Sequence, residues 1–188
     1  TSWYCSLIHD EIAFELVSRG PEGVELLLAE VDPGDAIRYR SILRALASAE
    51  DAKTMGPHRA RIERLLLDAV QDHRHPVVWH ALRGLSLLGV AIPKRDAMAL
   101  ANDPDPILAA GALDYICGVY PESAGPLLRS ALGSRHAVLR EAAVDEIEDR
   151  CIPGFVEEIR RLARDRSSRV REAATGAMRN LIDGPGVQ

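Results

Sequence analysis

VREAATGAM, residues 170–178, is the last of four segments that share one pattern at a spacing of 31 residues. The earlier three are VVWHALRGL (77–85), LAAGALDYI (108–116) and LREAAVDEI (139–147). Each begins with an aliphatic residue, has alanine four places on, and has leucine, isoleucine or methionine eight places on. Places i, i+4 and i+8 form one stripe of a helix. A period of this length predicts stacked helical repeats rather than a single layered core.

A second set of apolar positions repeats at the same spacing ahead of each segment. Leu66, Ala97, Leu128 and Ile159 form one such column. Pro57, Pro93 and Pro153 stand near three of the expected helix starts, where a missing N–H costs nothing. Each repeat is therefore expected to hold two helices. The repeats are expected within one domain, 1–188, at residues 22–49, 57–89, 93–119, 123–150 and 153–182.

A hydrogen-bond acceptor stands five places before each aliphatic anchor, and such side chains satisfy free N–H groups at a helix start. The acceptors are Asp72, Asp103, Ser134 and Asp165. Asp32 and Ile37 repeat this offset nine residues out of phase, so a loop is expected around Asp51 to Pro57. Before them, residues 3–18 predict an amphipathic helix that caps the stack, with an apolar face of Leu7, Ile8, Ile12 and Leu16.

Two of the repeats combine an aspartate, an aliphatic residue five places on, and then an arginine. They are Asp32, Ile37 and Arg38, and Asp165, Val170 and Arg171. The combination resembles the signature of HEAT repeats, most closely the short bacterial lyase-type HEAT-like repeats. Val78, Ala109 and Ser134 depart from it. The resemblance covers about residues 22–182, and it implies an all-α, right-handed α-solenoid of about five helix pairs whose second helices line a concave face.

Composition narrows the class of protein further. The 188 residues are 47% hydrophobic but only 4% aromatic, so leucine, alanine, isoleucine and valine must form the core. No apolar run approaches the ~20 residues of a membrane span. Cys5, Cys117 and Cys151 are too scattered for a disulfide framework, which favours the cytoplasm. Only two of the 23 basic residues are lysine, a bias typical of a bacterial gene rich in G and C.

Helix geometry predicts which residues line the concave face. At 100° per residue, places i+2, i+6 and i+9 lie opposite the buried stripe. Along the chain these places change from apolar, with Leu43 and Leu46, to acidic. The expected partner-binding residues are Tyr39, Trp79, Arg83, Asp114, Glu141, Asp145 and Glu148. Aromatic residues supply buried area and carboxylates steer a basic partner, although the carboxylates could also be a merely solvated helix face.

Motifs of known catalytic sites are absent from the sequence. It contains no GxGxxG, GxxxxGK, HExxH or GxSxG, and no histidine is followed by glutamate. His73, His75 and His80 cluster near a helix start, but without a companion cysteine or well-spaced carboxylate they favour a polar loop over a metal site. The chain is therefore expected to be non-enzymatic, with no cofactor and no metal.

The expected function is a protein-binding scaffold or adaptor, in one specific form a bacterial inhibitor or immunity-type protein that masks a basic toxin or nuclease. Two alternatives remain open. A chaperone or lyase similar to phycobilin lyases would use the same groove. A DNA-binding or DNA-repair protein would use the arginines between Arg160 and Arg171, but Glu157 pairs with Arg161 by helix spacing and an acidic groove repels phosphate.

Overall fold

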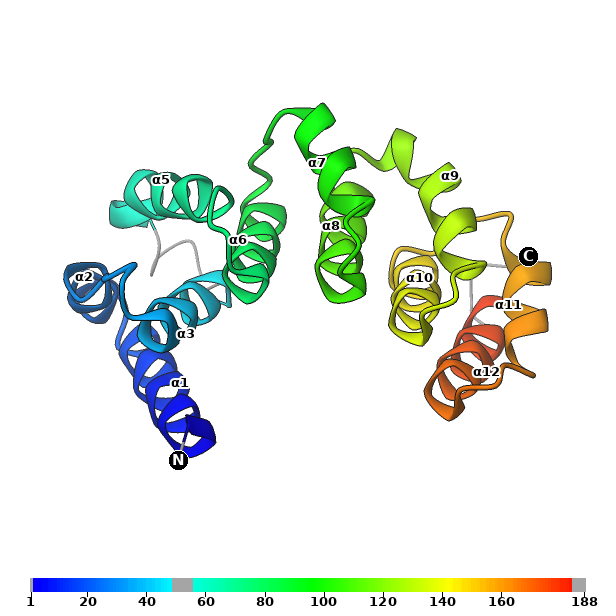
Figure 1. Ribbon diagram of the computed structural model, residues 1–188, viewed down its shortest axis with the longest axis horizontal. Coiled ribbons are helices and arrows are strands. Elements are labelled where there is room, and N and C mark those ends of the chain that lie inside the picture. Colours follow the sequence, from blue (N-terminus) through cyan, green and yellow to red (C-terminus); the bar gives the residue numbers. More distant parts are fainter. Residues whose placement is uncertain (1, 49–55, 184–188) are drawn as a thin grey trace. The chain divides into compact units, whose positions relative to one another are not determined.

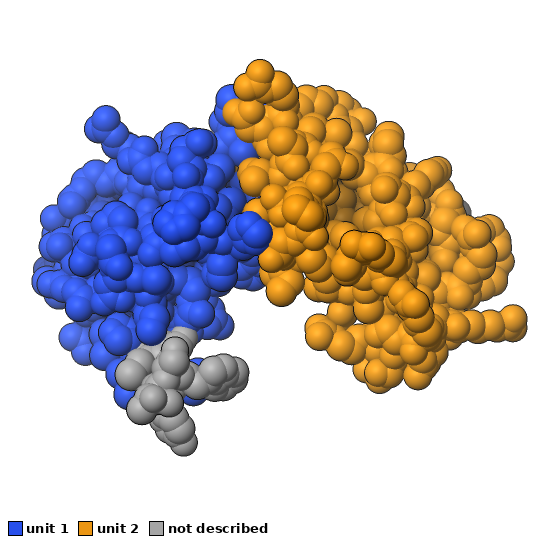
Figure 2. Space-filling view, viewed as in Figure 1, with its two compact units in different colours: residues 1–93 blue, residues 94–188 orange. Residues whose placement is uncertain are grey.

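The computed structural model describes residues 2–48 and 56–183, with side chains described for residues 7–48 and 56–180. Within these ranges the chain forms eleven α-helices, one short 3-10 helix and no strand (Figure 1). The prediction of an all-α protein is confirmed. Most of the loop expected around Asp51 to Pro57 lies outside the described residues. By contacts the chain divides into two compact units, Thr1–Pro93 and Lys94–Gln188 (Figure 2).

Unit 1 is built from two rows of helices. Its elements are α1 (Ser2–Ser18), α2 (Pro21–Ala29), α3 (Ala36–Ala47), η1 (Gly56–His58), α5 (Arg59–Ala69) and α6 (His75–Leu88). One row consists of α1, α3 and α6, in which α3 packs against both of the others. The second row is formed by α2, which packs on α1, and α5, which packs on α6.

Unit 2 repeats this arrangement with three further helix pairs. Its elements are α7 (Lys94–Ala101), α8 (Pro106–Val119), α9 (Pro121–Leu132), α10 (Ala137–Asp149), α11 (Val156–Leu162) and α12 (Ser168–Asp183). Helix α10 packs between α8 and α12 in one row, while α7, α9 and α11 each pack against their partner in it. The four second helices expected from the sequence correspond to α6, α8, α10 and α12.

The columns of apolar residues form the cores. The alanines at the fifth place of each segment, Ala81, Ala112, Ala143 and Ala174, are all fully buried. So is the column of Leu66, Ala97, Leu128 and Ile159 on the first helices. The anchors Val77, Leu108 and Val170 are buried too, whereas Leu139 is half-buried. Small alanines between larger aliphatic residues let the helix backbones approach closely, so burial follows the 31-residue period.

The turn before each second helix carries one recurring hydrogen bond. Asp72, Asp103 and Asp165 accept the backbone N–H two residues ahead at 2.8 Å, and Ser134 does so at 3.1 Å. Asp32 accepts from Gly34 in the same way, at 2.8 Å. These acceptors thus stabilise the turn that leads into the helix. The sequence predicts instead that they cap the helix itself, so the observed bond lies just before the predicted position. The shared bond identifies the five turns as equivalent.

The turn before α3 contains one more residue than the others. Helix α3 begins four residues after Asp32, whereas α6, α8, α10 and α12 begin three residues after their acceptors. Asp35 occupies the additional place and caps the helix by accepting from the N–H of Arg38 at 3.0 Å. One residue rotates a helix face by about 100°. The face predicted for α3 is therefore the wrong one.

Helix α1 also buries a different face from the one predicted. Within residues 7–18, where the side chains of α1 are described, Asp10, Ala13 and Val17 are buried, whereas Leu7, Ile8 and Ile12 are about half exposed. Leu16 is half-buried. The apolar stripe predicts the inner face, but in the structure Asp10 turns toward α3, where it pairs with Arg40 and Arg44.

Candidate binding surfaces

Six carboxylates gather along α10 and the adjoining face of α8. They are Asp114 from α8 with Glu141, Asp145, Glu146, Glu148 and Asp149 from α10, and we call them the acidic surface. Four of the predicted binding residues, Asp114, Glu141, Asp145 and Glu148, belong to it. All lie in unit 2, so their grouping follows from the packing of α8 on α10.

One edge of the acidic surface is a clamp around Arg150. Its guanidinium donates to Asp114 Oδ1 at 3.0 Å and to Glu146 Oε2 at 2.7 Å. Burial raises the pKa of Glu146 to about 7, and the Asp114 carboxylate adds to this shift while Arg150 opposes it. Burial also raises the pKa of the neighbouring Cys117 thiol to about 12. Cys117 is buried, and its thiol is neutral at physiological pH.

The centre of the acidic surface is Asp145, an exposed side chain that forms no ion pair with any described residue. Desolvation raises its pKa to about 6, and repulsion from Glu141, Asp149 and Glu148 adds to the shift. Around it, Glu141 accepts from Arg169 at 3.1 Å and Glu148 accepts from Asn180, both on α12. The positive charge of Arg169 opposes the shift of Asp145, but among the described residues the four carboxylates of Glu141, Asp145, Glu148 and Asp149 outnumber it.

The predicted binding residues in unit 1 are divided between core and surface. Tyr39 is buried, as are Leu43 and Leu46, so the prediction that these three face a partner is wrong. The additional turn residue before α3 rotates them inward, where Arg74 lies 5.8 Å from the Tyr39 ring centre. Burial raises the Tyr39 pKa. On α6, by contrast, Trp79 is half-buried and Arg83 is exposed, with its guanidinium 5.9 Å from the Trp79 ring centre.

A polar cluster between α1, α3 and α6 was not predicted. Asp10 is buried and accepts from Arg44 at 2.6 Å, while Arg40 lies 3.8 Å from the same carboxylate oxygen. His80 is also buried, with its ring centre 4.7 Å from that of Trp79. The four residues come from three helices that are far apart in sequence. Their only sequence signal is the spacing of Arg40 and Arg44, one helical turn apart.

Burial is the main reason that the His80 side chain is uncharged. It lowers the His80 pKa to about 4, and the positive charges of Arg40 and Arg44 lower it further. The imidazole is therefore neutral at physiological pH. Its Nδ1 atom is buried without a hydrogen-bond partner among the described residues, as are Asp10 Oδ1 and Ser41 Oγ. Such atoms are unusual, because buried polar groups are normally paired.

The three clustered histidines do not converge. His73 is almost fully exposed in the turn before α6, whereas His80 is buried within that helix. Among the described side chains no group of three or more His, Cys, Asp or Glu is arranged to hold a metal ion. Across the same part of the chain, no helix has the length and apolar character needed to cross a membrane.

Comparison with known proteins gives a likeness of fold only. No protein-family model matches the chain, and no curated protein matches it. Among solved structures, the crystal structure of an engineered protein is similar, with a TM-score of 0.54 and 18% sequence identity. The match covers 95% of this chain and 89% of the engineered one. Similarity at this level of identity carries no information on function.

Proposed function

We propose that this chain is a non-enzymatic protein-binding module that holds a basic partner on the acidic surface of α8 and α10. In this proposal the helix pairs form a HEAT-like α-solenoid of about five repeats, capped by α1. The turn hydrogen bond that recurs at Asp32, Asp72, Asp103, Ser134 and Asp165 supports the repeat assignment. Helical repeats offer long, rigid surfaces that suit binding to another protein.

The observation that carries the proposal is the charge around Asp145. Its carboxylate is exposed and unpaired among the described residues, and three other carboxylates lie close enough to raise its pKa. Such crowding is unfavourable in the free protein, so a cationic group of a partner would relieve it. A surface of this kind also speeds association with a basic protein, which is the property that an inhibitor of a basic toxin or nuclease needs.

The test is affinity capture from the native host with charge-reversed bait. Asp145→Lys combined with Asp149→Lys breaks no ion pair of the described residues, and lysine at residue 149 suits the end of helix α10. We expect this variant to lose the partner that the wild type retains. Its melting temperature should stay equal or rise, because the repulsion around Asp145 is removed.

A matched control is Glu157→Lys, which reverses an exposed carboxylate on α11 in the same unit. It should retain the partner. If the Asp145/Asp149 variant captures the same proteins as the wild type, the acidic surface is not the binding site and the proposal fails.

A further inference from the structure

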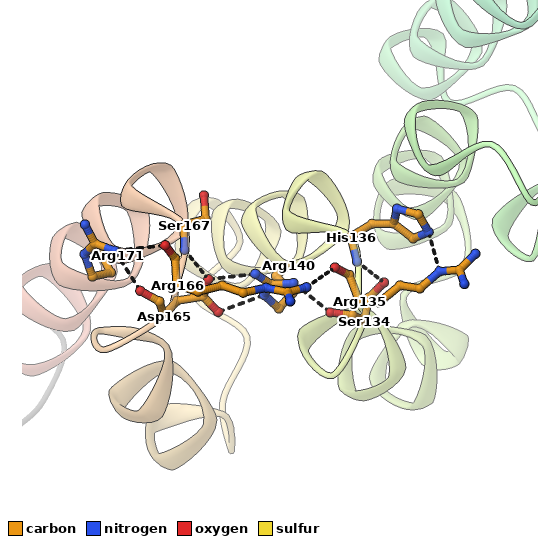
Figure 3. A network of polar contacts seen from close by, with 8 residues as sticks. All are labelled: Ser134, Arg135, His136, Arg140, Asp165, Arg166, Ser167 and Arg171. Carbon is orange, nitrogen blue, oxygen red and sulfur yellow. Dashed lines mark hydrogen bonds and ion pairs between the residues drawn. The ribbon is translucent and has the colours of Figure 1, made fainter.

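Arg171 of α12 occupies the same place in its repeat as Arg140 of α10, 31 residues earlier. Nη1 of Arg140 donates to the carbonyl oxygen of Ser134 at 2.8 Å. Nη1 of Arg171 donates to the carbonyl oxygen of Asp165, also at 2.8 Å (Figure 3). In each case the carbonyl belongs to the turn acceptor six residues before the arginine. The two guanidinium groups are therefore anchored to their turns in the same way.

The two guanidinium groups differ in the partners of their other nitrogen atoms. Nε and Nη2 of Arg140 donate to the two carboxylate oxygens of Asp165, at 2.8 and 2.6 Å. Arg171 is exposed, and its one further hydrogen bond to a described residue is again from Nη1, to the carbonyl oxygen of Arg166 at 3.3 Å. The planar edge of a guanidinium matches the two oxygens of a carboxylate. Among the described residues, this edge is filled on Arg140 and open on Arg171.

Arg171 lines an open pocket of about 350 Å³, a volume at the lower end of the range for small-molecule sites. The other lining residues come from the end of α11 and from α12, and they are Ala163, Ser168, Glu172, Thr175 and Arg179. Arg171, Thr175 and Arg179 follow one another at intervals of four residues, so they share one side of α12. Arg179 forms no ion pair with any described residue. The pocket thus combines two guanidinium groups with one carboxylate, that of Glu172, and favours an anion.

We propose that Arg171 binds the carboxylate group of a small organic acid, in the way that Arg140 binds Asp165. The class of ligand follows from that pair, since the equivalent guanidinium in this chain holds both oxygens of a carboxylate. Arg179 lies roughly 12 Å further along α12 by helix rise, so a second carboxylate on the acid would be attracted to it. The pocket shares no residue with the acidic surface and takes a ligand of opposite charge to the partner proposed there. This site therefore goes beyond the proposed function and does not depend on it.

The direct test is titration of the whole chain with succinate near neutral pH, followed by the NMR resonances of the arginine Nε–H groups. Succinamide has the same length without the charge, and sodium chloride at matched ionic strength measures simple screening. We expect a saturable shift of the Arg171 resonance with a Kd of about 10 mM or tighter. The Arg140 resonance is the internal control and should not move, because its Nε already donates to Asp165.

Arg171→Gln is the informative variant, because glutamine keeps an N–H donor but loses both the charge and the planar edge. We expect it to weaken succinate binding at least about tenfold. Arg171→Lys keeps the charge alone, so it should bind more weakly than the wild type but more tightly than Arg171→Gln. The matched control is Arg161→Gln, since Arg161 is exposed on α11 and does not line the pocket. It should leave binding unchanged.

Three results would overturn the proposal. One is a titration in which the Arg171 resonance shifts no further with succinate than with succinamide or sodium chloride. Another is an equal loss of binding in the Arg171→Gln and Arg161→Gln variants, since net charge alone would then be responsible. The third is an equal shift of the Arg140 and Arg171 resonances, which would show a general response of the protein to ionic strength.

Discussion

At the scale of single residues, Arg140 shows how consecutive turns are tied together. Its guanidinium donates to both oxygens of Asp165, at 2.6 and 2.8 Å, and to the carbonyl oxygen of Ser134 at 2.8 Å (Figure 3). The two side chains of this ion pair are only 6% and 9% exposed. Arg140 and the N–H of Ser167 hold the Asp165 pKa below its ordinary value. A buried pair of this kind is unfavourable to break, because one charge would remain without a partner.

Removal of the Arg140 side chain should therefore destabilise the protein strongly. We expect Arg140→Ala to lower the free energy of unfolding by about 3–5 kcal/mol, measured by urea denaturation. Arg171 is the matched control, because it donates in the same way to the carbonyl of Asp165 but is exposed. Arg171→Ala should cost less than about 1 kcal/mol. Equal losses would contradict the role assigned to the buried pair.

At the scale of elements, glycine sets how closely α2 approaches α1. A Cβ atom at residue 23 would lie 1.8 Å from the carbonyl oxygen of Leu16, and that backbone atom cannot rotate away. Gly125 is also helical, in α9, but a Cβ there would meet nothing within 4 Å. Glycine is thus required for the close packing of α2, whereas α9 has room for a larger residue at its glycine.

These two glycines give a paired prediction. Gly23→Ala should destabilise unit 1 by about 1–3 kcal/mol or more, because α2 must move away from α1. Gly125→Ala should stabilise the protein by about 0.5–1 kcal/mol, since alanine is the better helix former. Thermal unfolding of the two variants measures both changes. A neutral Gly23→Ala would mean that α2 does not rest against the α1 backbone.

Most of the helices could be predicted from the sequence, because the apolar core positions and the turn acceptors repeat at the same spacing of 31 residues. The four repeated segments, 77–85, 108–116, 139–147 and 170–178, each lie within one helix, namely α6, α8, α10 and α12. The rotation of α1 could not be predicted, since apolar spacing does not reveal that Asp10 finds a partner in Arg44. Packing against a neighbour decides which of two possible faces is buried.

The outward-facing residues could be predicted only for helices preceded by a turn of the usual length. The helices α6, α8 and α10 each begin three residues after their turn acceptor, and there opposite-face geometry predicted the outward side chains correctly. Arg83 and Asp145 are exposed, and the half-buried residues are Trp79, Asp114, Glu141 and Glu148. The same geometry failed for Tyr39, where the approach is longer. For the same reason the sequence did not predict that Arg40 and Arg44 lie on the outward face of α3. It assigned that face to Tyr39 and Leu43, one residue earlier in each case.

At the scale of the whole molecule, the two units respond to acid in opposite directions. His80, in unit 1, has a folded-state pKa of about 4 against an ordinary 6.5, so the folded state binds fewer protons than the unfolded chain between these values. Glu146, in unit 2, has a pKa of about 7 against an ordinary 4.5, so the folded state binds more protons. Acidification should therefore weaken unit 1 and strengthen unit 2.

Hydrogen exchange of α6 and α10, corrected for the intrinsic rate, should show this contrast. As the pH falls from 7 toward 5, protection of α6 should decrease and protection of α10 should increase, each by about 2 kcal/mol. His80→Gln should abolish the first change and Glu146→Gln the second. Parallel changes in both helices would show that other titrating groups dominate.

The additional residue before α3 bears on how a chain of this kind can evolve. Inserting one codon in a turn exchanges the face that a helix shows to solvent, without altering the helix itself. Such a step survives only when the newly inward residues are apolar, as Tyr39, Ile42, Leu43 and Leu46 are. A single insertion can thereby replace an apolar exposed face of a helix by a cationic one. Later substitutions then need only keep the newly buried side chains well packed.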